Sequence, residues 1–175
     1  LELSEAISVV SKAISGKTTS QILEGIKMVC EDNKLVLSAT DLEISIEKTI
    51  RAEVASAGET VVPGRLFGEY IKKLTNEQIE CELNERNQLK ISYTDSEGVL
   101  QCMDVNEFPS LKEVEKKNYF EINKEDFRTL INNVYYAVAQ DDSRPILKGI
   151  LIETTGTNIR AVAVDGCRLY IANKQ

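Results

Sequence analysis

The chain has 175 residues, with 21 Lys and Arg against 28 Asp and Glu, a formal net charge of −7, four Cys and no His. This length allows one domain or two small ones, and 42% hydrophobic with 28% charged residues describes a folded rather than a disordered protein. Because His is absent, Ser-His-Asp and Cys-His catalysis and HExxH zinc sites are excluded. No apolar run reaches the ~20 residues that cross a bilayer, and the first residues lack the basic leader of a secretory signal, so we expect a cytoplasmic protein.

The first predicted element is a helix over residues 3–15. Its apolar residues recur at i, i+3, i+4 and i+7, as in Leu3, Ile7 and Val10, while serines and Lys12 occupy the opposite face. Apolar and polar residues then alternate over 26–30, 35–39 and 44–46, which predicts three strands.

A second unit repeats this order. Residues 59–62 predict a strand, and Pro63 suits the start of a helix over 64–74. Alternation at 79–83 and 89–93, around a polar turn, predicts a hairpin, and a last strand is expected near 98–103. The predicted order of elements in this unit is thus one strand, one helix and then three strands.

Periodicity stops after residue 106. We therefore predict a first domain over 1–106, a linker over 107–118 and a further region over 119–175. That region is expected to hold a strand at 119–122, a helix over 127–139 capped by Asn123, and strands around 147–153, 159–164 and 169–172.

An internal repeat links the two ends of the chain. A shift of 124 residues places Val10 on Val134 and Asp41 on Asp165 without a gap. Repeats of this kind indicate duplicated structural units. The sequence therefore predicts an α+β fold built from duplicated β-α-β-β-β units.

The predicted helices are basic in an acidic chain. They carry five basic residues (Lys12, Arg65, Lys72, Lys73 and Arg128) and two acidic ones (Glu5 and Glu69), a net charge of +3. Either these residues only solvate the helices, or they line a surface that faces a polyanion such as duplex DNA, with weak attraction and no base readout. The four cysteines contain no CxxC pair, so we expect buried free thiols of a reduced protein.

Five short segments, in this order, resemble the bacterial sliding clamp family, the beta subunit of DNA polymerase III. They are ATDLE at 39–43, VVPGR at 61–65, EFP at 107–109, SRPILKG at 143–149 and AVDGCRL at 163–169. The resemblance implies the DNA clamp fold, with helices on one face of antiparallel sheets, in a protein of three domains. It also implies a homodimeric ring around double-stranded DNA that tethers the polymerase and has no catalytic activity of its own. This chain would hold the first domain without its initial strand and about half of the second.

The resemblance, together with the basic helices, assigns two sets of site residues. The DNA-binding set is Lys12, Lys17, Arg65, Lys72, Lys73, Arg128 and Arg144. The set that binds peptides of DNA polymerase III alpha, the clamp loader and other partners is Leu147, Val164, Gly166, Cys167, Arg168 and Leu169. Cys167 departs from the His of some relatives, and without the resemblance Leu147 and Leu169 would be interpreted as core residues. No catalytic residue, metal or cofactor is expected.

Two other functions remain open at this point. A metal-dependent hydrolase could use Asp41 and Glu43, or Asp141 and Asp142, because carboxylates bind Mg²⁺, although these residues also suit turns. A protein adaptor of the same duplicated fold would have no affinity for DNA. Neutralising Lys17, Arg65 and Lys72 would then leave DNA retention unchanged.

Overall fold

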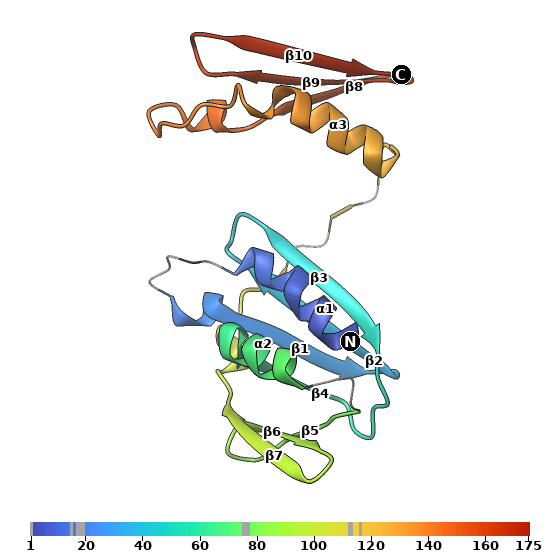
Figure 1. Cartoon of the computed structure of the whole chain (residues 1–175), viewed down its shortest axis with the longest axis vertical. Coiled ribbons are helices and arrows are strands. Elements are labelled where there is room, and N and C mark those ends of the chain that lie inside the picture. The colour runs from blue at the N-terminus through green and yellow to red at the C-terminus, as the bar shows by residue number, and fades with distance from the viewer. Residues whose placement is uncertain (1, 15, 17–19, 75–77, 112–113, 116) are drawn as a thin grey trace. The chain divides into compact units, whose positions relative to one another are not determined.

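The computed structural model describes residues 2–14, 16, 20–74, 78–111, 114–115 and 117–175 (Figure 1). The chain forms two compact units, Leu1–Lys112 and Glu113–Gln175. The longest α-helix in the described residues has 12 residues, and none of the described helices could span a membrane.

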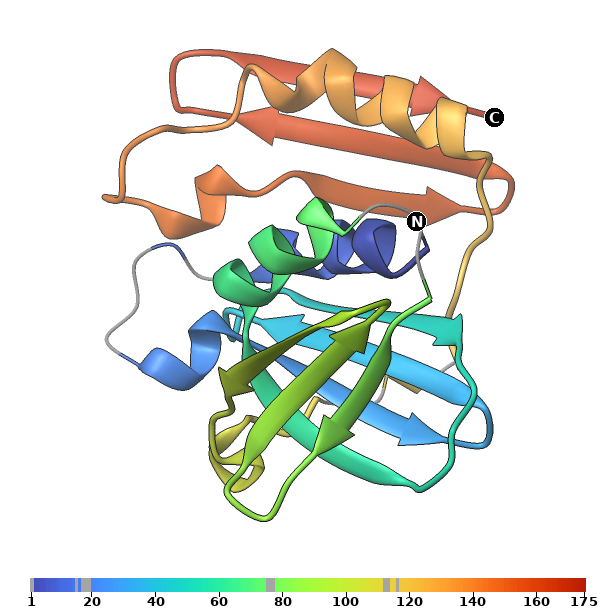
Figure 2. The same cartoon turned by 60° about the horizontal axis from the view of Figure 1, so that its bottom comes forward.

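The described residues of the first unit form two antiparallel sheets. One has the order β3-β2-β1-β4, from Gly25–Glu31 (β1), Lys34–Thr40 (β2), Ser45–Arg51 (β3) and Gly58–Pro63 (β4). The other has the order β5-β6-β7, from Glu80–Leu83, Gln88–Tyr93 and Ser96–Gln101. Helix α1 (Glu2–Val10), extended by the 3₁₀ turn η1 (Ser11–Ala13), and helix α2 (Gly64–Lys73) lie side by side on the same side of the sheets (Figure 2).

The apolar faces of the helices explain this arrangement. Ile7 and Val10 of α1 and Phe67 and Ile71 of α2 are buried in one cluster with the inward side chains of both sheets. Gly68 lets the helices approach closely, because a Cβ atom there would lie 3.3 Å from Cγ2 of Ile7. The predicted helices and strands of this unit are confirmed, with shifts of a few residues at their ends.

The described residues of the second unit form one α-helix, one 3₁₀ helix and one sheet. Helix α3 (Lys124–Tyr135) begins after Asn123, whose Oδ1 accepts a hydrogen bond of 2.9 Å from the Glu125 backbone N–H, as predicted for its cap. The 3₁₀ helix η4 (Pro145–Lys148) follows, then an antiparallel sheet of order β10-β9-β8, from Leu151–Thr155 (β8), Asn158–Val164 (β9) and Leu169–Lys174 (β10). Leu130 and Val134 of α3 are buried against Ile159, Ala161 and Ala163 of β9.

The predicted repeat is present in three dimensions. Strand β9 begins and ends 124 residues after β2. The 3₁₀ helix η4 likewise begins and ends 124 residues after the 3₁₀ helix η2 (Gln21–Glu24). The cross-strand register also repeats, because Lys27 pairs with Ser38 in the first unit and Leu151 pairs with Val162 in the second. The duplicated α+β fold, with helices on one face of antiparallel sheets, is therefore confirmed.

The predicted strand at 119–122 is wrong. These residues are irregular. Within the described ranges β8 pairs with β9 alone, whereas its counterpart β1 pairs with both β2 and β4. A strand needs a neighbour for its backbone hydrogen bonds, and no described residue stands beside 119–122 in that role.

Three further expectations need correction. Helix α3 covers 124–135 rather than 127–139, because the chain leaves the helix at Tyr136 with 3₁₀-type bonds. Residues 145–148, at the start of the strand predicted around 147–153, form η4. All four cysteines are free as expected, yet only Cys102 is buried, since Cys81 and Cys167 are exposed and Cys30 is half-buried. Phe108, in the segment 107–118 predicted as a linker, is buried in a cluster with Ile22, Leu23 and Val61.

Candidate nucleic-acid and peptide interfaces

Basic side chains lie on the solvent side of α2. With Phe67 and Ile71 facing the core, Arg65, Lys72 and Lys73 are all exposed. Lys72 and Lys73 occupy the last turn, where positive charge is favoured by the helix dipole. Because these side chains point to solvent, they can meet a large anion without unfolding the helix.

Arg65 is almost fully accessible to solvent. Its side chain is 93% exposed, and Nε lies 3.1 Å from Oε1 of Glu69, one turn further along the helix. Exposed ion pairs of this kind contribute only about 0–1 kcal/mol to stability. The guanidinium can therefore exchange Glu69 for a phosphate at little cost.

The remaining predicted DNA contacts lie on several elements. Lys12 is exposed in η1, Arg128 is exposed on α3, and Arg144 is exposed at the start of η4. Lys17 lies outside the described residues. The loop that carries Arg144 is held by a hydrogen bond of 2.9 Å from the Ser143 N–H to Asp141 Oδ1. Hydrogen bonds from the Ser143 side chain and backbone also hold the pKa of Asp141 below its usual value.

The helices are less basic than predicted. With their observed ends, α1, η1, α2 and α3 carry six basic and five acidic side chains, a net charge of +1 rather than +3. The difference arises because α1 begins at Glu2 and α3 at Lys124, so that acidic residues such as Glu125 enter the first turns. Acidic residues are favoured at these positions by the helix dipole.

Five of the six predicted peptide-binding residues lie on one strand–turn–strand segment. Val164 ends β9, Leu169 begins β10, and the two are cross-strand partners. Gly166 in the turn has a φ of +91°, a conformation that glycine adopts without strain. Leu147 lies on a different segment, η4, where its backbone bonds to Arg144 and Ala139.

Asp165 fixes this turn. Its Oδ1 accepts hydrogen bonds of 3.0 Å from the backbone N–H groups of Cys167 and Arg168, and its Oδ2 accepts one of 2.7 Å from Arg168 Nε. The bond from Cys167 and those from Arg168 lower the pKa of the Asp165 carboxyl below its usual value. The predicted contact residue Arg168 is thus held in place by a residue that the sequence did not assign to the site.

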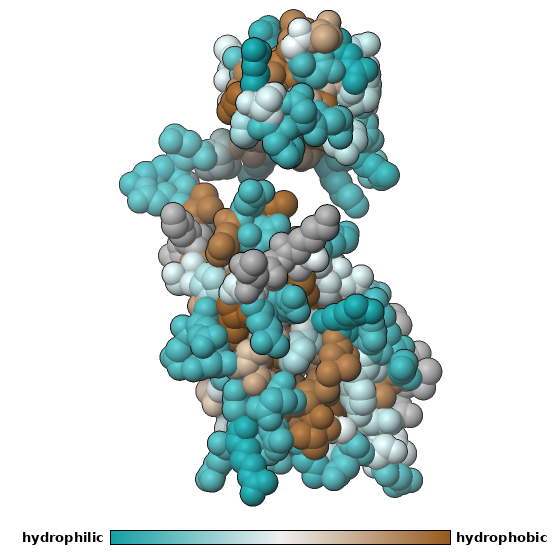
Figure 3. Space-filling model, turned by 90° about the vertical axis from the view of Figure 1, so that its left-hand side faces the viewer, coloured by the Kyte–Doolittle hydropathy of each residue, from teal (hydrophilic) through white to brown (hydrophobic). Residues whose placement is uncertain are grey.

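Leu169 is not a core residue. It is 58% exposed, while Val164 and Leu147 are half-buried and Ile146, beside Leu147, is 85% exposed. Apolar side chains reach the surface of both units among hydrophilic ones (Figure 3). The interpretation of Leu169 as a core residue, made without the resemblance, is wrong, because Leu169 lies on the sheet face opposite α3.

An aromatic pair near Leu169 was not predicted. The rings of Tyr136 and Tyr170 meet edge to face, with centroids 4.7 Å apart. Desolvation, and then Tyr170, raise the pKa of Tyr136. The alternating pattern of β10 indicates a strand that contains Tyr170. It does not indicate that Tyr170 contacts Tyr136, at the end of α3.

The acidic residues considered for a metal site are used in turns. Asp41 Oδ1 accepts hydrogen bonds from the backbone N–H groups of Ile44 (2.7 Å) and Glu43 (3.0 Å), and these bonds lower its pKa. This is the arrangement of its repeat partner Asp165. Among the described residues, no group of three or more His, Cys, Asp or Glu side chains is placed to hold a metal ion.

Comparisons with known proteins agree on one family. The family model described as the DNA polymerase III beta subunit, N-terminal domain, matches residues 2–112, and that of the central domain matches residues 121–175. The beta sliding clamp of Staphylococcus epidermidis is 33% identical over 172 residues, which cover 94% of this chain and 46% of that protein. The chain thus spans about half the length of the curated relatives it matches.

Solved structures give the same result. The DNA polymerase sliding clamp of Bacillus subtilis superposes with a TM-score of 0.94 at 30% identity, over 99% of this chain and 48% of that one. The DNA polymerase III subunit beta of Pseudomonas aeruginosa superposes with a TM-score of 0.92 at 30% identity, over 98% of this chain and 47% of that one.

Proposed function

The chain belongs to the DNA polymerase III beta subunit family of sliding clamps, and on that premise we propose that it is part of a non-catalytic processivity factor of DNA replication. Its first unit corresponds to clamp domain 1, and its second unit to the first half of domain 2. In the intact cytoplasmic protein, two subunits form a ring around duplex DNA.

The observation that carries this proposal is the arrangement of the first unit. α1, its extension η1 and α2 share one side of the sheets, and η1 and α2 present Lys12, Arg65, Lys72 and Lys73 to solvent. A helical layer of nearly balanced charge attracts phosphates weakly and without sequence preference. Such a surface suits a protein that must slide, since tight contacts would stop it.

The second unit supports a further part of the proposal, a wall for partner peptides. The exposed Leu169, half-buried Val164 and Leu147, and the fixed Arg168 combine apolar contact area with one placed charge. Peptide and ligand sites are commonly built in this way. The partners would be DNA polymerase III alpha, clamp-loader subunits and other proteins that carry a short apolar motif.

Primer extension tests the proposal. With the organism's replicative polymerase and clamp loader, the intact protein should lengthen the products made in a single binding event, because tethering raises the effective concentration of polymerase at the primer. A protein adaptor without affinity for DNA would leave product length unchanged, and that result would contradict the proposal.

A further inference from the structure

The sheet face opposite α3 carries a row of apolar side chains. Alternation along β9 points Ile159, Ala161 and Ala163 into the core under α3, so Val162 and Val164 point to the other face. Val162 is the cross-strand partner of Leu151 on β8 and of Ile171 on β10. Leu151 is 56% exposed and Ile171 is 52% exposed.

The fold does not require this row to be apolar. In the first unit, the repeat partners of Leu151, Val162 and Ile171 are Lys27, Ser38 and Glu47, which have the same cross-strand register. Two hydrogen-bonding contacts hold those polar residues: Ser38 Oγ donates to Glu47 Oε2 at 3.4 Å, and Lys27 pairs with Glu59 at 2.8 Å. One scaffold therefore carries a polar row in one copy and an apolar row in the other.

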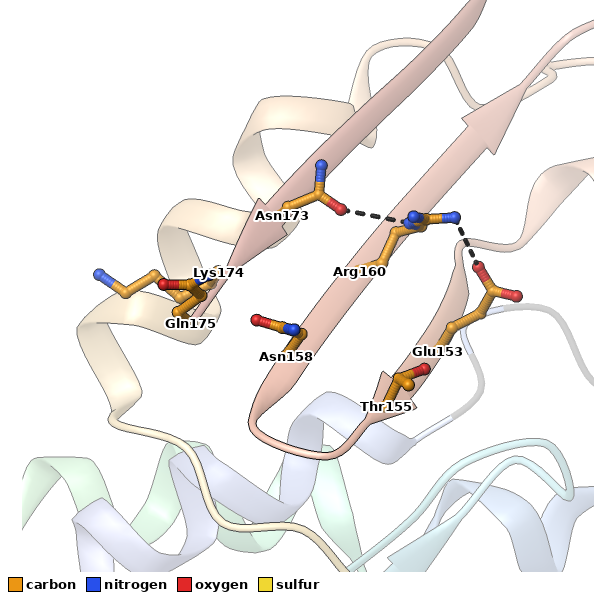
Figure 4. Close-up of a pocket in the computed structure, with 7 residues that line it drawn as sticks. All are labelled: Glu153, Thr155, Asn158, Arg160, Asn173, Lys174 and Gln175. Carbon is orange, nitrogen blue, oxygen red and sulfur yellow. Dashed lines mark hydrogen bonds and ion pairs between the residues drawn. The ribbon is translucent and has the colours of Figure 1, made fainter.

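The apolar row is bounded by polar side chains on the same face. Arg160 Nε donates to Asn173 Oδ1 at 3.2 Å, and the Arg160 guanidinium lies 3.8 Å from Glu153 Oε2 (Figure 4). These residues line a pocket together with Thr155, Asn158, Lys174 and Gln175. Arg160, Glu153 and Asn173 therefore form a polar group that borders the apolar row and is not part of it.

We propose that Leu151, Val162 and Ile171 extend the peptide wall and bind an apolar side chain that flanks the main anchor of the partner peptide. This inference rests on the proposed function, because Val164 and Leu169 of that wall form the next cross-strand pair along the same face. The row and the wall are therefore one continuous apolar strip.

The dimensions of the strip favour a peptide over a folded partner. Neighbouring strands lie about 4.8 Å apart, so three strands present a strip only about 10 Å across. Stable interfaces between folded proteins bury about 800 Å² on each partner, which five partly exposed side chains do not supply. One or two side chains of an extended peptide fit this strip.

Binding of two synthetic peptides to the intact protein tests the inference by fluorescence anisotropy. Both carry a Leu-Phe anchor, and they differ only in a flanking residue, Ile or Ser. We expect the Ile peptide to bind about 10-fold more tightly, which corresponds to about 1.4 kcal/mol. Ile171→Glu, which installs the residue of the first unit, should abolish this preference, and Val162→Ser should reduce it.

The outcomes separate the inference from the proposed function. Leu169→Ala should weaken both peptides alike, and Thr155→Ser, at the polar end of the face, should change neither. If Leu169→Ala weakens binding but wild type and Ile171→Glu show the same preference, the extension is wrong and the wall stands. If neither peptide binds wild type, the wall itself is contradicted. Thermal unfolding of Ile171→Glu and Val162→Ser checks that both variants remain folded.

Discussion

Truncation of Leu169 should weaken partner peptides by more than its modest loss of stability explains. Burying a Leu side chain completely contributes about 1.5–3 kcal/mol. Leu169 is 58% exposed, so a bound peptide that covers it can gain about that fraction of the burial free energy, or roughly 0.9–1.7 kcal/mol. Leu169→Ala should therefore raise the Kd of the Leu-Phe peptide about 4- to 16-fold.

Leu66 offers a matched control. It is also a partly exposed leucine, at 53%, but it lies on α2 of the first unit. Leu66→Ala and Leu169→Ala should lose similar stability, roughly 1 kcal/mol each, from the buried part of the side chain. Titration by fluorescence anisotropy, with urea unfolding of both variants, measures the two effects. An equal change in peptide affinity in both variants, or none in Leu169→Ala, would refute the assignment of Leu169 to the wall.

Three further outcomes are expected. Log affinity for duplex DNA should fall with log salt concentration less steeply when Arg65→Gln and Lys72→Gln are combined, by up to about 1.8 in the magnitude of the slope. Lys90→Gln on β6, whose ion-pair partner is Glu97, should leave the slope unchanged. Equal slopes in the double variant and wild type would contradict the α2 contacts. Asp165→Asn should destabilise the protein at neutral pH but not below the folded pKa of Asp165. Folding lowers the pKa of Asp165, so its carboxylate stabilises the folded protein at any pH above the pKa of the unfolded chain, and this stabilisation is lost as the pH falls through the lower pKa of the folded protein. A difference in urea unfolding that does not change with pH would be inconsistent with this. Phe67→Ala should cost about 3–5 kcal/mol of unfolding free energy, because Phe67 is fully buried; a loss under about 1 kcal/mol would mean that α2 is not anchored as described.

Much of the fold could be predicted because its signals are local. The i, i+3, i+4 spacing around Ile7 and Val10 marked α1, and Asn123 marked the start of α3. The gap-free match of Asp41 with Asp165 reflected a turn with the same hydrogen bonds in both copies. In these cases a few neighbouring residues determine the structure.

The errors concern features that depend on distant residues. Residues 119–122 have strand propensity, but a strand also needs a neighbouring strand, which local sequence does not reveal. The exposure of Leu169 and Ile171 depends on which face of β10 meets α3, and the contact of Tyr136 with Tyr170 joins a helix end to a strand. The apolar row became visible only when the registers of the two copies were compared.

Retention on closed circular DNA tests the central claim most directly. After loading, the intact protein should stay on a closed circle at a salt concentration that removes proteins held by phosphate contacts alone, because a threaded ring has no end to leave from. Cutting the circle once should release it. If the protein leaves closed and cut DNA at the same rate, the encircling ring is contradicted.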